Sequence, residues 1–267
     1  RNVSTRGIFT TAGGNIDLNA RRDVTSTGRL NASGDVTLVA DIGLIDVDAL
    51  IAGGNIDTMS RFSTTTGTQS ARGSVTGVAG REYTSGLIIS DTGPIDVTST
   101  GTARIAGYNS GGTASVTSLT GDVALMASSF SVNDTNLTAN NGSVIATTTG
   151  LLGGSRVGIS TIGSGSLLNI DAGEFIETGN LSSEGDITTE SGLSTSVWQQ
   201  EAAGSITGVA GTTYDSGKMT ATNGFIDVMS TGATTIAGYN SGGDADIVSS
   251  GGSIDITEAS RSAAKAN

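Results

Sequence analysis

The carboxylates are the side chains of this chain whose type and spacing come closest to catalytic chemistry. Six of them gather in one stretch, at Asp171, Glu174, Glu177, Glu184, Asp186 and Glu190. Paired carboxylates serve as the acid and the base in enzymes that cleave polysaccharides. However, no Lys or Arg lies among these six, and the Gly-rich turns between them would spread their side chains over different corners. We therefore expect a solvated acidic face or a loose calcium site, and no enzyme.

The composition removes most other chemistry. The chain has 267 residues with 41 Gly, 1 Pro, no Cys and no His, so it lacks the commonest transition-metal ligands and the commonest general base. The calcium-binding phrase Gly-Gly-x-Gly-x-Asp is approached once, at Gly242-Gly243-Asp244-Ala245-Asp246, but is not met. We predict no cofactor, with calcium as the one metal that the acidic residues would suit. A net charge of −12 argues against nucleic acid as a partner.

These residues belong to a sequence with a short repeating phrase. The phrase is Gly, a small or polar residue, an aliphatic, Asp or Thr, and usually a second aliphatic, as in Gly14-Asn15-Ile16-Asp17-Leu18. It recurs after 20, 20, 19 and 20 residues, and then after 28, 21, 23, 20, 19, 20 and 28 residues. A near-constant step of this kind indicates a solenoid in which each repeat forms one coil.

Alternation of aliphatic and polar residues within a coil indicates strands. We predict three short strands in the first coil, Asn15–Ala20, Asp23–Thr27 and Arg29–Ser33. The whole chain is then an all-β, right-handed parallel β-helix (β-solenoid) of about 13 coils of roughly 20 residues. Since alternate residues of a strand face opposite sides, one column of residues should point inward and the next outward. The expected interior column is Ile16, Val36, Ile56, Val75 and Ile95, and the expected outward column is Asp17, Thr37, Asp57, Thr76 and Asp96.

A second, longer repeat divides the chain. Residues 73–125 match residues 204–256 at a constant offset of 131, with 28 of 53 positions identical. We expect residues 1–267 to form a single β-solenoid that contains this internal duplication and ends in a polar tail at 260–267.

Both copies contain Tyr-Asn-Ser-Gly-Gly, which supplies the candidate contact residues. Each piece lies inside a 28-residue step, so we expect a loop or an extra partial coil there. An exposed tyrosine could touch a sugar ring or a neighbouring molecule through its ring and hydroxyl, or it could simply cover a corner of its own coil. The candidate partner or glycan contacts are Tyr108, Asn109, Tyr239 and Asn240.

The phrases of the first two coils resemble the repeat region of filamentous haemagglutinin-like adhesins, the large exoproteins of bacterial two-partner secretion. They are Gly14 to Leu18, Asp23-Val24-Thr25-Ser26-Thr27-Gly28 and Leu30-Asn31-Ala32-Ser33-Gly34-Asp35-Val36-Thr37-Leu38. As a pattern the resemblance covers nearly the whole chain. It implies a right-handed parallel β-helix that is exported across the outer membrane and acts in attachment, biofilm or contact between cells.

The sequence therefore predicts a secreted, extracellular or cell-surface structural and adhesive repeat protein that mediates attachment, biofilm matrix or filament assembly. The alternative is a carbohydrate-binding or polysaccharide-cleaving β-helix, which a groove with clustered aromatic residues and paired carboxylates would favour.

Charge and hydropathy add expectations about partners. Residues 1–104 hold 9 Arg against 10 acids, whereas residues 105–267 hold 4 basic residues against 15 acids. We expect copies of the chain to associate head to tail or laterally, and host or bacterial surface glycans or proteins are the other expected partners. No apolar stretch approaches the roughly 18 residues of a membrane span, so we expect no membrane span. Because the chain opens with Arg1-Asn2-Val3, we expect it to be processed or a portion of something longer.

Overall fold

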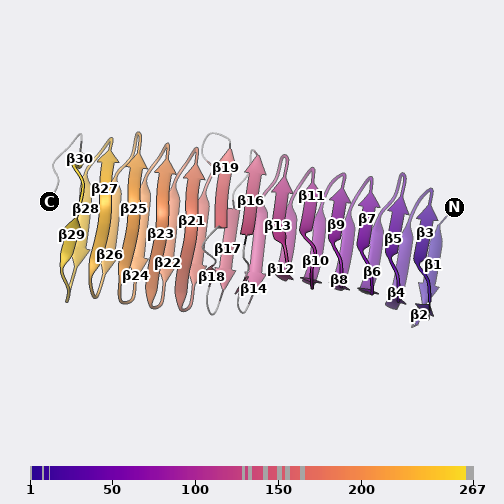
Figure 1. The fold of residues 1–267 in the computed structure, drawn as a ribbon. Helices are drawn as coiled ribbons and strands as arrows, with labels where there is room; N and C mark the ends of the chain where they lie inside the picture. The colour runs from indigo at the N-terminus through magenta and orange to yellow at the C-terminus, as the bar shows by residue number, and fades with distance from the viewer. Residues whose placement is uncertain are drawn as a thin grey trace. The chain divides into compact units, whose positions relative to one another are not determined.

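The computed structural model describes residues 2–7, 9–11, 13–127, 130–131, 134–140, 144–148, 152–153, 157–162 and 166–262. In these residues the chain forms parallel strands and no helix, and the strands wind into a β-solenoid of about 11 turns. This confirms the predicted parallel β-helix, while the predicted number of about 13 coils is slightly too high. The chain divides into two compact units, Arg1–Met126 and Ala127–Asn267, and each shows strands stacked in two layers (Figure 1).

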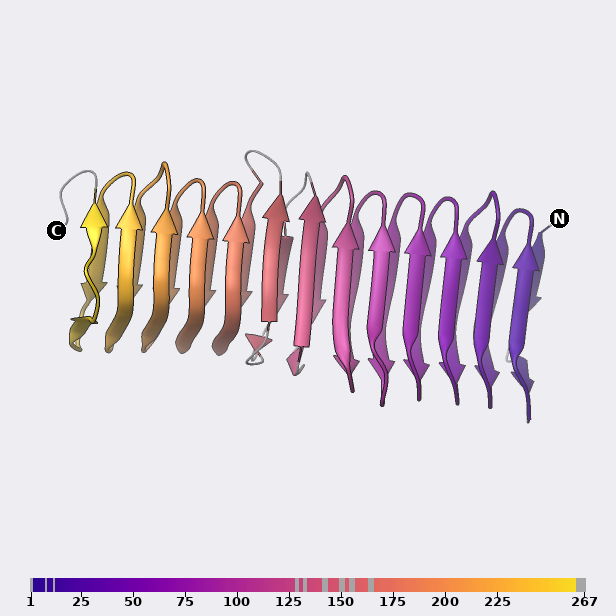
Figure 2. The same cartoon turned by 45° about the horizontal axis from the view of Figure 1, so that its top comes forward.

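Unit 1 contains one short and one long strand in each coil. The short strands pair with one another in parallel and are β3 (Ile16–Ala20), β5 (Val36–Ala40), β7 (Ile56–Ser60), β9 (Val75–Ala79), β11 (Ile95–Ser99) and β13 (Thr113–Ser118). The other layer contains β1 (Val3–Arg6), β2 (Phe9–Thr11), β4 (Val24–Ala32), β6 (Ile45–Ala52), β8 (Thr64–Ala71), β10 (Tyr83–Ser90), β12 (Ala103–Ser110) and β14 (Val123–Ala127). Within each unit all arrows of a layer point the same way (Figure 2).

Unit 2 repeats this arrangement. Its short strands are β17 (Val144–Thr148), β20 (Leu168–Ala172), β22 (Ile187–Ser191), β24 (Ile206–Ala210), β26 (Ile226–Ser230) and β28 (Ala245–Ser249). Its other layer contains β16 (Asp134–Asn140), β19 (Val157–Ile162), β21 (Phe175–Ser183), β23 (Ser194–Ala202), β25 (Tyr214–Ala221), β27 (Thr234–Ser241) and β29 (Ile254–Ile256). The remaining strands are β15 (Phe130–Ser131), β18 (Leu152–Gly153) and β30 (Arg261–Ser262). The first part of the predicted tail thus pairs with β27, and residues 263–267 lie outside the described residues.

The long strands bend, which explains why the sequence predicts three strands per coil where the structure has two. In β4 the alternation of buried and exposed residues breaks at Gly28, where φ is +128°. A Cβ at Gly28 would also overlap the carbonyl oxygen of Gly7, which directly follows β1 in the neighbouring coil. The predicted strands Asp23–Thr27 and Arg29–Ser33 are therefore the two halves of one strand that turns a corner at a glycine.

The interior of each unit is a set of stacked columns. The predicted column of Ile16, Val36, Ile56, Val75 and Ile95 is confirmed, because each residue pairs with the next in register and all five are buried. The equivalent column of unit 2 is Leu168, Ile187, Ile206, Ile226 and Ala245. Burial of one aliphatic side chain contributes about 1.5–3 kcal/mol, so the columns supply much of the stability of each coil.

A ladder of side-chain oxygens explains the glycine of the repeating phrase. Asn15 Oδ1 accepts the backbone N–H of Asp35 at 2.9 Å, and Asp35 Oδ1 accepts that of Asn55 at 2.7 Å. Asn55 Oδ1 in turn accepts the N–H of Ser74 at 2.9 Å. A Cβ on the residue before each donor would overlap the accepting oxygen, and those residues are Gly34, Gly54 and Gly73.

Each unit also buries a tyrosine in a polar cluster. In unit 1 the amide nitrogen of Gln69 lies 2.7 Å from the hydroxyl of Tyr83 and 3.1 Å from that of Ser85. All three side chains are buried. The residues of unit 2 that lie 131 positions later in the sequence form the same contacts, and they are Gln200, Tyr214 and Ser216. The duplication therefore preserves a buried hydrogen-bond arrangement as well as a surface pattern.

Candidate binding surface

The predicted tyrosine contacts lie in strands rather than in loops. Tyr108 belongs to β12, pairs in register with Ile88 and is 5% exposed, while Asn109 is exposed. Tyr239 belongs to β27 and is half-buried, and Asn240 beside it is exposed. The expectation of a loop or extra partial coil at these tyrosines is therefore wrong, and the role of the four residues as contacts for a partner or glycan stays a prediction.

The 28-residue steps have a different origin, which is a change of layer. Ile95 on β11 pairs with Ala114 on β13, and Ala103 on β12 pairs with Val123 on β14, so the coil keeps its normal length. The phrase that begins at Gly121 simply falls before β14 in the long-strand layer. The second long step, which ends at Gly252, shows the same change before β29.

The six carboxylates between Asp171 and Glu190 are all exposed, and the structure separates most of them. Asp171 and Glu190 pair on neighbouring short strands, whereas Glu177 lies on the long strand β21. Asp186 Oδ1 accepts the backbone N–H of Ser205 at 2.7 Å, so this carboxylate belongs to the oxygen ladder of unit 2. The six carboxylates are therefore solvated but do not share one face, because the strands and corners that carry them belong to different layers.

The part of the chain that the structure describes contains no cluster of side chains that could bind a metal ion. No group of three or more Asp or Glu side chains lies close enough there to hold a metal ion. Calcium binding stays a prediction from the sequence.

The most regular feature of the exposed surface is an apolar column on the short strands of each unit. In unit 1 it consists of Val39, Met59 and Val78, and we call it the Met59 column. In unit 2 the equivalent Met229 column consists of Val209, Met229 and Val248. Met59 is 55% exposed and Met229 50% exposed. The sequence analysis did not predict either column. It could have done so, because an apolar residue stands at the fourth position of successive short strands.

Acidic residues flank both columns on one side. The predicted outward column of Asp17, Thr37, Asp57, Thr76 and Asp96 is confirmed, with each residue paired to the next. Carboxylates there fall on alternate coils, which limits repulsion between like charges. In unit 2, by contrast, Asp227 and Asp246 are direct neighbours in the register.

Basic and aromatic residues gather at the corner that follows the short strands of unit 1. Arg21, Arg61 and Arg81 are exposed there, and the guanidinium of Arg81 lies 4.7 Å from the ring centre of Phe62. This cation–π contact holds one arginine against the corner. On the surface of unit 1, the Met59 column therefore lies between an acidic column and a basic corner.

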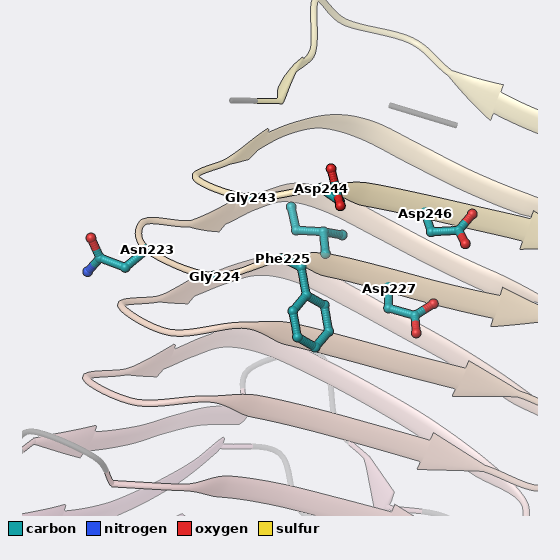
Figure 3. A pocket seen from close by; sticks show the side chains of 8 residues that line it. Asn223, Gly224, Phe225, Asp227, Gly243, Asp244 and Asp246 are labelled. Atoms are coloured by element: carbon teal, nitrogen blue, oxygen red, sulfur yellow. The ribbon is translucent and has the colours of Figure 1, made fainter. Parts of the chain in front are cut away.

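A shallow hollow of about 370 Å³ lies beside the Met229 column. It is lined by Asn223, Phe225, Asp227, Asp244 and Asp246, with Phe225 48% exposed. Figure 3 shows that Asp227 and Asp246 project from neighbouring strands, while the Phe225 ring extends over the adjoining strand. The ring offers an exposed apolar surface beside the hydrogen-bond acceptors of the carboxylates.

Within the described residues, no helix has the length and apolar character needed to cross a membrane. Comparisons with protein-family models, with curated proteins and with solved structures find no match to this chain.

Proposed function

We propose that this chain is a structural and adhesive segment of a secreted or cell-surface bacterial protein of the filamentous haemagglutinin-like type. Its contacts are made by the repeated surface of the solenoid rather than by a catalytic centre. The observation that carries the proposal is the repetition of an apolar column on the outer face of each unit, Val39–Met59–Val78 in unit 1 and Val209–Met229–Val248 in unit 2. In each column the first valine is half-buried and the other two residues are exposed. Apolar residues that adjoin one another on an exposed face mark surfaces that contact other molecules.

The physical argument concerns how binding strength builds up. One exposed Met or Val contributes little to binding, but identical contacts repeated along a rigid surface add to one another and raise the overall avidity. Such a surface tolerates the loss of any one residue. An enzyme, in contrast, loses activity when one catalytic side chain is removed.

Attachment of coated beads tests the proposal. Beads carrying the chain should adhere to wells coated with bacterial or host surface extracts, and beads carrying a non-adhesive protein of similar charge should not. Single substitutions such as Met229→Ser should reduce adhesion partly, and substitution of both columns should reduce it strongly. Beads that adhere no better than the control would overturn the proposal.

Carbohydrate binding is a second candidate function, and the hollow at Phe225 favours it. The exposed ring could stack on a sugar while Asp227 and Asp246 accept hydrogen bonds from its hydroxyls. Affinity electrophoresis through gels containing neutral polysaccharides tests this, with Phe225→Ala compared with the wild type. Retardation that disappears in Phe225→Ala supports glycan binding, equal retardation of both proteins excludes this site, and release of reducing ends would indicate cleavage.

A further inference from the structure

The exposed residues around Met59 follow one another in the order acidic, apolar, basic. Along β7 and its end, the outward residues are Asp57, Met59 and Arg61, spaced two residues apart. An acidic residue, an apolar residue and a basic residue therefore follow one another over about 13 Å. Such an order is complementary to itself when the strand direction is reversed.

We propose that the short-strand face of unit 1 binds the same face of a second copy of this chain, an inference that rests on the proposed structural and adhesive function. The two faces are related by a twofold axis parallel to the direction in which the strands stack. Under this symmetry Met59 meets Met59 of the second copy, and Asp57 meets Arg61 of the second copy. The interface thus has an apolar centre with an ion pair on each side, as expected of an isologous contact.

The neighbouring coils obey the same complementarity. Asp17 meets Arg21 of the second copy, and Asp96 meets Thr100 of the second copy. Asp41, the acidic residue at the basic corner, meets Thr37 rather than another carboxylate. The apolar side chains Val39 and Val78 meet their own counterparts. In none of these five coils does a charge oppose a like charge.

The opposite orientation fails on electrostatic grounds. A twofold axis parallel to the strands would place the acidic column of one copy against that of the other. Asp17, Asp57 and Asp96 would then face carboxylates, and like charges that oppose one another are destabilising. The two copies therefore lie side by side with their coils stacking in the same direction.

Unit 2 lacks the basic half of the pattern. The strands around Met229 begin with Asp227 and Asp246 on their outward sides and end at Thr231 and Ser250. A twofold contact there would have an apolar centre without ion pairs. The unit 2 face is thus an internal control for the face of unit 1.

The size of the face sets the expected affinity. Five strands of five residues cover about 24 Å by about 17 Å, or roughly 400 Å² per copy. A stable interface buries roughly 800 Å² per partner, so this contact should be weak and reversible in solution. It becomes effective when many copies lie on one surface, because their contacts then act together.

Variants that exchange the charges of Asp57 and Arg61 test this interface. Self-association is measured by sedimentation velocity at low salt, at protein concentrations from about 10 μM to about 1 mM. The wild type should dimerise with increasing concentration. Asp57→Arg and Arg61→Asp should each weaken self-association by about tenfold or more, because each places two like charges in contact. An equimolar mixture of the two variants should associate, since every pair in the mixed dimer is again oppositely charged. The double variant should dimerise like the wild type.

Two further variants separate the contact from general effects on folding or stickiness. Met59→Asp should abolish dimerisation, whereas Met229→Asp should leave it unchanged, and circular dichroism confirms that each variant is folded. A wild type that stays monomeric, single charge variants that dimerise normally, or loss of dimerisation only in Met229→Asp would each overturn the inference.

Adhesion of coated beads to foreign surfaces is measured in parallel. Adhesion without dimerisation rejects this interface alone, and dimerisation without adhesion rejects the adhesive function alone.

Discussion

The ring of Tyr83 fills the space that a side chain at Gly77 would occupy. A Cβ built on Gly77 would lie 2.6 Å from Cζ of Tyr83, and Gly208 has the same relation to Tyr214 in unit 2. The two tyrosines are fully buried and pair in register with small residues, Tyr83 with Thr64 and Ala103. The largest side chains of the interior therefore depend on a glycine in the facing strand.

The first prediction concerns this glycine. Gly77→Ala should lower the free energy of unfolding by about 1–3 kcal/mol, because the tyrosine ring must shift in a close-packed interior. Urea unfolding followed by circular dichroism measures the change. Gly13→Ala is the control, since a Cβ there meets no atom within 4 Å. A similar small effect of both substitutions would show that the ring of Tyr83 can move without cost.

The second prediction concerns the hydrogen bond between Gln69 and Tyr83. Removal of the hydroxyl in Tyr83→Phe should cost about 1 kcal/mol, since the amide nitrogen of Gln69 keeps the hydroxyl of Ser85 as a partner. In a double-mutant cycle with Gln69→Leu, the coupling energy should be about 0.5–1.5 kcal/mol. Gln69→Leu combined with Tyr214→Phe is the control pair, and its effects should add. Equal coupling in both cycles would contradict a direct interaction.

The third prediction is a loss of stability at alkaline pH. Burial raises the pKa of Tyr83 and Tyr214 above the ordinary value of 10.0, although hydrogen bonds from neighbouring side chains partly oppose this. An unfolded tyrosine therefore releases its proton at a lower pH than the folded one. The resulting stability is complete below about pH 10 and falls as the pH rises further, by up to about 1.4 kcal/mol per pH unit for each tyrosine.

The variant Tyr83→Phe/Tyr214→Phe tests this assignment. Urea unfolding at about pH 8 and about pH 11 should show a smaller loss of stability for the double variant than for the wild type. The two proteins differ only at these two tyrosines, so the contributions of all other groups cancel in the comparison. The same loss in the two proteins would mean that other groups cause the alkaline destabilisation.

The periodic features of the fold could be predicted from the sequence. The interior column from Ile16 to Ile95 and the outward column from Asp17 to Asp96 follow from two regularities, the step of about 20 residues and the alternation within strands. Both regularities lie in the order of the residues and need no knowledge of contacts. The outward column also gave the correct spacing of carboxylates in unit 1.

Features that depend on contacts between layers could not be predicted in the same way. The glycine phrase at Gly121 looks like every other phrase, but it begins a strand in the long-strand layer. The glycines around Tyr108 suggested a loop, whereas pairing with Ile88 places this residue in a strand. The pairing of Gln69 with Tyr83 joins residues on neighbouring coils, and no local pattern indicates it. The apolar columns could have been predicted from the same step that places Ile56 beside Val75, because Met59 and Val78 share that register.

The fourth prediction concerns the oxygen ladder. Gly54→Ala should destabilise the chain by about 1 kcal/mol or more, because the new Cβ overlaps Asp35 Oδ1 and disturbs its hydrogen bond to the N–H of Asn55. In an Asp35→Ala background the same substitution should cost less, since the obstructing oxygen is gone. Thermal and urea unfolding of the four proteins measure this. Additive effects would show that the glycine is required for another reason.

The fifth prediction concerns Asp227 and Asp246, which face the same side on adjacent strands. Like charges directly opposite one another destabilise a sheet, so Asp227→Asn should raise the free energy of unfolding by about 0.2–1 kcal/mol at low salt. This gain should shrink as salt screens the repulsion. Asp96→Asn is the matched control, because Asp96 lies between Thr76 and Ser115 and should give no gain. If Asp227→Asn gave the same gain at high salt, the benefit would come from the backbone or from packing rather than from relief of charge repulsion. If it lowered stability, the two carboxylates would have a stabilising role that their like charges alone do not predict.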